Sequence, residues 1–389
     1  MVDNQITTGR RLPLGVYLLA VSLFAMGSAE FLLAGVLPPA AQDLGVSLAS
    51  AGSLISAFAL GVVLGGPPLA IVTLGWPRKL TLVASQAVFA LAVAVFLLAD
   101  QFWVLLVARF VAGVAYAGFW AVAAVTAVGL VTAERTARAS GVVVSGLSLS
   151  MIAGGPAGAL VSHFTGWRGG FWGVVALTAA SAAALALALP ATGRREAPDV
   201  RGELRSMRQP RLWLVYAVTI LSTASYMITF NYLAAILTGV TGLPEVWVPP
   251  VLALFGVGAF AGLAVGGRIA DRRPFRALAT GAGGIAASSV LLALFARAPI
   301  PAIVLVAALG VAGFVLNPAI YQRVFALADR APTLAGATAV SAFQLGISLT
   351  PALAGAALHA GAALTAVAWI GAALAGLTLL AVRRDATSR

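Results

Sequence analysis

The stretch LPLGVYLLAVSLFAMGSAEFLLAGVLPP, residues 12–39, decides the fold class of this chain. Apart from Glu30, its side chains are apolar, small or weakly polar, and it exceeds the roughly 20 residues that a helix needs to cross a bilayer. Comparable runs recur along the whole chain. We therefore predict an all-α polytopic membrane protein, because a transmembrane β-barrel would instead show short segments of alternating hydrophobicity.

The composition supports this class. The chain is 61% hydrophobic and 9% charged, with a mean hydropathy of +1.01, whereas soluble domains are about 45–50% apolar and about 25% charged. The net charge of +12 does not indicate a nucleic-acid partner, because the arginines are confined to connections between apolar runs. The chain has no cysteine, which excludes disulfides and thiolate metal sites.

Twelve spans are expected, and one long polar stretch, residues 191–211, divides them six and six. The expected spans are 14–37, 50–73, 79–99, 102–130, 138–162, 168–190, 212–238, 247–270, 276–296, 300–325, 333–358 and 362–382. The predicted units are an N-terminal six-helix bundle over 1–190, a cytoplasmic basic linker over 191–211 and a C-terminal six-helix bundle over 212–389.

The distribution of Lys and Arg predicts the orientation. If the N-terminus is inside, the outer side carries only Arg168 and Arg297, and Arg109 lies within a span. The other basic residues then face the cytoplasm, as the positive-inside rule requires. We expect a multi-pass protein of the inner (plasma) membrane with both termini cytoplasmic.

The two halves of the sequence resemble each other. GWPRK (75–79) follows the second expected span and DRRPFR (271–276) follows the eighth, at an offset of 197 residues that also carries Gly113 onto Gly310. Parallel repeats of six helices are a transporter architecture, with the substrate site at the repeat interface near the membrane midplane.

These motifs make the chain resemble the major facilitator superfamily, whose loop signature is Gly-x-Leu-Ala-Asp-Arg-x-Gly-Arg-Arg. The second copy, GRIADRRPFR (267–276), keeps more of it than the first, AIVTLGWPRK (70–79), which has Ala70, Leu74 and Pro77 at three signature positions. The resemblance implies a cytoplasmic gate formed by Arg78, Lys79, Gly267, Asp271, Arg272 and Arg276.

Further motifs resemble the twelve-span drug:proton antiporter group. RFVAG (109–113) is similar to its span-four motif, and AGGPAGAL (153–160) to its span-five antiporter motif, here Gly154, Gly155, Pro156 and Gly158. GSAEFLLAGVLP (27–38) and FGVGAFAGLAVGGRIADRRP (255–274) look closest to actinobacterial chloramphenicol-resistance exporters. The resemblance implies that Gly155-Pro156 kinks span five and seals the outer end of the cavity; a plain packing kink is the alternative.

Glu30 is the only carboxylate expected inside a span, and Arg109 is the only cation well inside one. Counted at 1.5 Å per residue, both lie roughly 7–10 Å outward of the span centres. Ionisable groups at membrane depth are costly and mark ion or substrate pathways, so we predict proton coupling by this pair. The alternatives are a structural polar group for Glu30, and a static ion pair or a clamp on backbone carbonyls for Arg109.

A pocket for an amphiphilic, mostly uncharged ligand requires aromatic and polar side chains that face the repeat interface, although packing or a lipid-facing position is the alternative for each of them. The candidate substrate-binding residues are Glu30, Phe31, Tyr116, Trp120, Tyr226, Phe230, Asn231, Asn317, Tyr321, Phe343 and Gln344.

The predicted function is proton-coupled export of small amphipathic antibiotics such as chloramphenicol by alternating access. The expected partners are the drug, protons and the lipid bilayer, and the protein is expected to be a monomer without cofactor, metal or catalytic residues. No Walker loop indicates ATP drive. The alternatives are an exporter of a sugar, purine or other metabolite, an uncoupled facilitator, and a membrane enzyme, which His163 and His359 at span ends do not favour.

Overall fold

The computed structural model describes residues 12–73, 76–132, 135–189, 209–328 and 332–387, and the predicted linker lies mostly outside them. Helices are the regular structure of these residues. The first half contains α1 (Leu14–Asp43), α2 (Leu48–Val72), α3 (Arg78–Leu98), α4 (Phe102–Gly129), α5 (Thr136–Leu149), the π-helix η3 (Ser150–Gly154), α6 (Gly155–Thr165) and α7 (Trp167–Ala188). The second half contains α9 (Pro210–Asn231), α10 (Leu233–Gly239), the 3-10 helix η4 (Glu245–Trp247), α11 (Val248–Ala270), α12 (Pro274–Phe295), α13 (Pro299–Leu327), α14 (Pro332–His359) and α15 (Ala366–Thr387).

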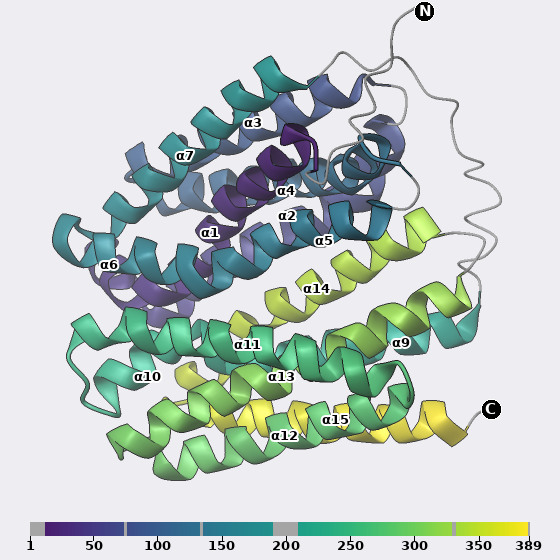
Figure 1. The fold of residues 1–389 in the computed structure, drawn as a ribbon. Helices are drawn as coiled ribbons and strands as arrows, with labels where there is room; N and C mark the ends of the chain where they lie inside the picture. The colour runs from purple at the N-terminus through teal and green to yellow at the C-terminus, as the bar shows by residue number, and fades with distance from the viewer. Residues whose placement is uncertain (1–11, 74–75, 133–134, 190–208, 329–331, 388–389) are drawn as a thin grey trace, which may run out of the picture.

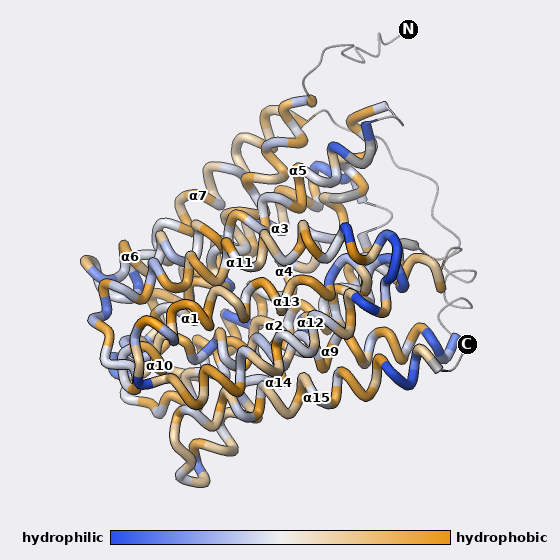
Figure 2. Tube along the Cα trace, turned by 60° about the horizontal axis from the view of Figure 1, so that its bottom comes forward, coloured by the Kyte–Doolittle hydropathy of each residue, from blue (hydrophilic) through white to orange (hydrophobic). Residues whose placement is uncertain are grey.

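Among the described residues, twelve helical segments are long and apolar enough to cross a membrane, which confirms the predicted number of spans. In Figure 1, helices α1–α7 and α9–α15 form two stacked bundles, and the start of α1 and the end of α15 lie at the same end of the molecule. We call this the terminal end and the opposite one the distal end. Figure 2 shows largely apolar helices whose most hydrophilic segments lie at their ends.

Close glycine contacts repeat in the two halves. A Cβ atom on Gly113 of α4 would lie 2.0 Å from the carbonyl oxygen of Phe58 in α2, and one on Gly310 of α13 would lie 2.2 Å from that of Phe255 in α11. Both members of the second pair are 197 residues beyond those of the first. The predicted internal repeat is therefore a repeat of helix packing, in which glycine allows two backbones to approach closely.

We predict that Gly113→Ala destabilises the protein by about 1–3 kcal/mol, the usual cost of overpacking, because the added methyl group meets backbone and not a movable side chain. Gly283→Ala in α12 is the matched control, since a Cβ there has no atom within 4 Å and alanine favours a helix by about 1 kcal/mol over glycine. Thermal unfolding in detergent measures this: the Tm of the Gly113→Ala variant should be lower than that of the natural protein, and the Tm of the Gly283→Ala variant should not.

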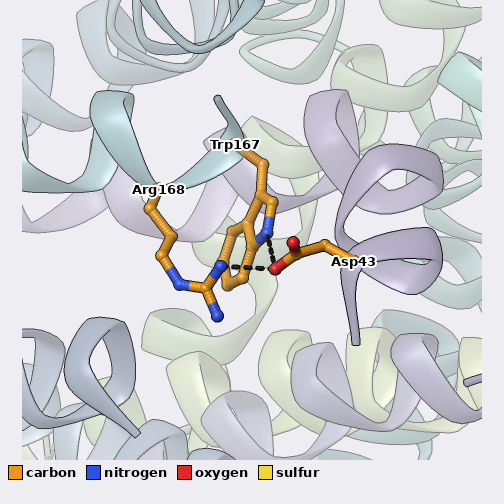
Figure 3. A network of polar contacts seen from close by, with 3 residues as sticks. All are labelled: Asp43, Trp167 and Arg168. Atoms are coloured by element: carbon orange, nitrogen blue, oxygen red, sulfur yellow. Dashed lines mark hydrogen bonds and ion pairs between the residues drawn. The ribbon is translucent and has the colours of Figure 1, made fainter. Parts of the chain in front are cut away.

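The first helix is longer than predicted. It continues beyond residue 37 through Pro38 and Pro39 to Asp43, although each proline removes one helical hydrogen bond, and the last residue has partners in another helix. The Asp43 carboxylate accepts a hydrogen bond of 2.9 Å from Trp167 Nε1 and pairs with Arg168, whose guanidinium lies 4.4 Å from the Trp167 ring centroid (Figure 3). Arg168, one of the two basic residues that the sequence predicts on the outer side, thus has an acidic partner.

The fifth span is interrupted by the π-helix η3, directly before Gly155-Pro156. Proline has no N–H to continue the helical hydrogen bonds, which explains a local change of helix type at this position. The motif glycines pack against α1, where Cβ atoms on Gly154, Gly155 and Gly158 would lie within 3 Å of Ser28, Phe31 and Leu32. The geometry thus gives this motif a packing role, and a sealing role stays a prediction.

The two halves meet along several helix pairs. Helix α2 packs against α14, and Ser56 Oγ donates a hydrogen bond of 2.7 Å to the carbonyl of Ser348 across this interface. Other contacts between the halves involve distal segments: α10 packs against α1, and α11 packs against η3 and α6. At one of them a Cβ atom on Gly256 would lie 2.6 Å from the Cα of Ile152.

Candidate functional site

Glu30 lies close to the middle of α1, since this helix extends further than the sequence predicts. Its side chain is partly accessible, whereas its neighbours Ala29 and Phe31 are buried. Gln344 of α14 donates a hydrogen bond of 3.0 Å from Nε2 to Glu30 Oε1. Because α1 and α14 belong to different halves, the one carboxylate predicted to lie within the membrane is bonded across the interface between them.

The oxygen of the Gln344 amide has no hydrogen-bond partner among the described residues. The side chain is buried, and Oε1 is shielded from solvent without a hydrogen-bond donor in the described part of the chain. A buried carbonyl oxygen without a donor costs about 1–3 kcal/mol, and such atoms in a native structure require an explanation.

Arg109 of α4 is fully buried beside Glu30. Its Nε donates to the carbonyl of Leu54 at 3.2 Å and its Nη1 to the carbonyl of Ala29 at 3.3 Å. Its guanidinium carbon lies 4.7 Å from the Phe58 ring centroid, a cation–π contact. No ion pair within 4.0 Å joins it to Glu30 among the ion pairs of the described residues, so the geometry is that of the carbonyl clamp.

An aromatic cluster extends from Phe31, next to Glu30, into the other half. The Phe31 and Phe230 ring centroids lie 6.2 Å apart, and those of Phe230 and Phe255 lie 4.6 Å apart. Tyr226 continues the cluster, with its ring 6.5 Å from that of Phe255 and 5.4 Å from that of Phe314. Phe31, Tyr226 and Phe230 are among the substrate residues predicted from the sequence, whereas Phe255 and Phe314 are not. The repeat could have indicated Phe255, which is equivalent to Phe58 beneath Arg109.

Other predicted substrate residues lie in smaller groups. Tyr321 of α13 packs 5.5 Å from Phe343 of α14, the residue before Gln344. Tyr116 is buried against Phe58 at 5.6 Å, and Trp120 is partly buried on the same helix.

The two predicted asparagines differ in their surroundings. Asn231 ends α9, where the expected seventh span breaks before α10, and its Nδ2 donates a hydrogen bond of 2.7 Å to Thr350 Oγ1 of α14. This bond lies within the second half and joins the end of α9 to α14. Asn317 lies beside the Tyr226 hydroxyl.

The residues of the predicted gate lie at the terminal end, where α2 and α11 meet α3 and α12. Arg78 begins α3, and its Nη1 donates a hydrogen bond of 3.4 Å to the carbonyl of Val125 in α4. Lys79 follows it and is partly exposed, as is Gly267 near the end of α11. In the second copy of the loop signature, residues 267–276, the charged gate residues Asp271, Arg272 and Arg276 are exposed.

One polar pair was missed because the last span was expected to end at residue 382. Helix α15 continues to Thr387 and buries Asp385, which pairs with Arg323 of α13 at 2.5 Å. Breaking a buried pair leaves an uncompensated charge, so we predict that Asp385→Asn lowers the free energy of unfolding by about 3 kcal/mol. Chemical unfolding in detergent measures this, and Asp271→Asn at an exposed position should change little.

At the distal end the halves also approach through polar residues. A cavity of about 250 Å³ lies between α2 and α14, lined among others by Ser50, Ser53, Gly355 and His359. His163 Nδ1 lies 3.8 Å from Glu245 Oε2 in η4. No group of three or more His, Cys, Asp or Glu side chains among the described residues could hold a metal ion.

Comparison with known proteins agrees with this architecture. The family model described as Major Facilitator Superfamily matches residues 19–351. The chain is 40% identical over 348 residues to a chloramphenicol resistance protein of Streptomyces lividans, covering 88% of each chain. It is 32% identical to a chloramphenicol efflux pump of Mycobacterium tuberculosis (strain H37Rv), covering 93% of this chain and 90% of the relative.

A further relative and two solved structures are also similar to this chain. The inner membrane transport protein YdhP of Escherichia coli (strain K12) is 30% identical over 364 residues, or 94% of each chain. A bacterial homologue of the human lysosomal transporter Spinster aligns with a TM-score of 0.74 at 18% identity, over 95% of this chain and 92% of that one. The nucleoside transporter NupG aligns with a TM-score of 0.76 at 13% identity, over 95% and 99%. The chain therefore belongs to the major facilitator superfamily and is a membrane transporter, not an enzyme.

Proposed function

We propose that this protein exports small amphipathic drugs of the chloramphenicol type in exchange for protons. Two relatives that the chain matches over most of its length are described as a chloramphenicol resistance protein and a chloramphenicol efflux pump. The observation that carries the coupling is the hydrogen bond between Glu30 and Gln344, because it joins an ionisable group in one half to a polar side chain in the other.

The proposed site combines apolar side chains for the ring of such a drug with polar side chains for its hydroxyl and amide groups. The rings of Phe31, Phe230 and Phe255 are buried against one another in this state, and we expect them to offer apolar and edge-to-face contacts to an aryl group in the state that exposes them. Glu30 and Gln344 lie beside them and offer polar contacts to hydroxyl or amide groups. We expect Tyr226, Tyr321 and Phe343 to shape the remaining wall, and the clamp of Arg109 on the Ala29 carbonyl to fix the backbone next to Glu30.

Alternating access follows if the two bundles, residues 1–190 and 212–389 joined by the linker 191–211, rock around this site. The contacts of α10 with α1 and of α11 with η3 and α6 support a state closed at the distal end. The excess of basic residues at the terminal end favours the cytoplasm for that end, in the inner membrane of the cell. In this scheme Glu30 takes a proton from the outer side and releases it inward while the drug moves out.

Everted membrane vesicles from a susceptible host test the proposal. With the terminal end exposed to the medium, a pH gradient, acidic inside, should drive labelled chloramphenicol into vesicles that contain the protein and not into control vesicles. Cells expressing the protein should grow at several-fold higher chloramphenicol concentration.

The same vesicles separate the alternatives. Uptake that survives collapse of the gradient would indicate a facilitator, and uptake of a labelled sugar or purine without chloramphenicol uptake would indicate a metabolite exporter. Cross-linking in the membrane tests the expected monomer.

A further inference from the structure

We propose that Gln344 is a specificity-determining residue at which a proton and a hydrogen-bond donor of the substrate compete. The inference rests on the proposed function and adds a mechanism and a substrate class to it. Gln344 Nε2 donates a hydrogen bond to Glu30, and Gln344 Oε1 is buried without a donor among the described residues.

The protonation state of Glu30 determines whether the NH₂ group or the oxygen of the Gln344 amide faces it. An ionised carboxylate only accepts hydrogen bonds, so it binds the NH₂ group and leaves the amide oxygen in the unpartnered position. A protonated carboxyl group donates, and it binds the amide oxygen if the amide turns over by half a rotation. The NH₂ group then occupies the unpartnered position. Proton uptake by Glu30 therefore changes the free group of Gln344 from an acceptor to a donor.

The free group of Gln344 predicts the chemical class of the substrate. While Glu30 is ionised, the unpartnered position requires an O–H or N–H donor, and a buried acceptor without one carries a free-energy cost. The ring cluster that begins at Phe31, the neighbour of Glu30, favours an aryl or other flat apolar group. The preferred substrate is thus a neutral molecule with a hydroxyl or amide donor next to an aromatic ring, and protonation of Glu30 weakens its binding.

The surroundings leave Glu30 as the group that titrates. The other ionisable side chains that act on Glu30, or on which its charge acts, are Arg109 and Tyr116 of α4 and Tyr226 of α9, and Tyr321 of α13 lies near these tyrosines. Arginine keeps its proton at any physiological pH, and an ordinary tyrosine ionises only near pH 10. Helix α2, which packs against both α1 and α14, contains no ionisable residue.

Equilibrium binding to the purified full-length protein in lipid nanodiscs tests the proposal. The two probes are chloramphenicol and a derivative whose hydroxyl groups and amide nitrogen are methylated, so that it donates no hydrogen bond. For the natural protein, chloramphenicol should bind about tenfold more weakly at acidic than at alkaline pH. The derivative should bind about tenfold more weakly than chloramphenicol at alkaline pH, with little dependence on pH.

Gln344→Leu removes both ends of the amide at similar volume, and Gln344→Met repeats the test with a flexible side chain. In both variants the two probes should bind alike, independently of pH. Gln86→Leu is the matched control, because Gln86 is the buried glutamine of α3, bonded to Ser181 away from the site, and it should keep the pattern of the natural protein.

The outcomes separate the two proposals. If both Gln344 variants still bind chloramphenicol more weakly at acidic pH and still discriminate between the probes, the role of Gln344 is wrong and the proposed function stands. If the natural protein binds neither probe at any pH, the proposed function fails and this inference fails with it. Thermal unfolding of each variant confirms that the binding data come from folded protein.

Discussion

Glu30→Gln is expected to abolish drug export driven by a pH gradient and to leave the protein folded in the membrane. Glutamine has nearly the same shape and can still bond to Gln344, but it cannot take up or release a proton. The variant therefore keeps the contact between α1 and α14 and loses the group that we propose to carry the proton. Uptake of labelled chloramphenicol by everted vesicles should fall to the level of vesicles without the protein.

Two further measurements make this test specific. Exchange of labelled for unlabelled drug across the vesicle membrane requires alternating access but no net proton movement, so Glu30→Gln should retain it. Glu245→Gln changes a carboxylate whose side chain is 70% exposed at the distal end, and it should export as the natural protein does. Gradient-driven export by Glu30→Gln at the natural rate would contradict the coupling role.

The sequence predicts the fold well because the signals for it are local. A membrane span is indicated by the length of its own apolar run, and the repeat by an offset that Gly113 and Gly310 share. The predicted ends of two helices are wrong, and in both cases residues near the helix end pair with a residue distant in the sequence. The first span continues to Asp43, which pairs with Arg168, and the last continues past Asp385, which pairs with Arg323.

Local signals also predict part of the candidate site, and contacts between distant parts of the chain account for the rest. Helical rise alone placed Glu30 and Arg109 at similar depth, and the structure brings Arg109 to the carbonyl beside Glu30. The side chain that bonds to Glu30 is Gln344, 314 residues away. Gln344 was predicted as a substrate residue, but its bond to Glu30 depends on which faces of α1 and α14 meet, and that is a property of the assembled halves.

A double cysteine variant, Ala49→Cys with Gly355→Cys, is expected to lose transport completely on oxidation and to regain it on reduction. Ala49 lies in α2 and Gly355 in α14, at the distal interface between the halves, and a Cβ atom on Gly355 would lie 3.4 Å from that of Ala49. Disulfides require Cβ atoms about 3.5–4.5 Å apart, so the bond should form in this state with little movement. The chain has no cysteine of its own, so the engineered pair is the only thiol pair present.

A control disulfide within one half distinguishes a block of the movement between the halves from other effects of oxidation. Gly284→Cys with Ala312→Cys makes the same two exchanges between α12 and α13, both in the second half. The corresponding Cβ atoms would lie 2.9 Å apart, so these two helices must separate slightly to reach disulfide geometry. If the halves rock as units, this bond moves with its bundle and transport continues after oxidation. The bond between Ala49 and Gly355 instead joins surfaces that must separate for the distal end to open, so drug binding from the terminal side should persist while release on the other side stops. Full transport with that disulfide formed would mean that the distal contacts of α2 and α14 stay closed throughout the cycle, and the opening would then have to lie elsewhere.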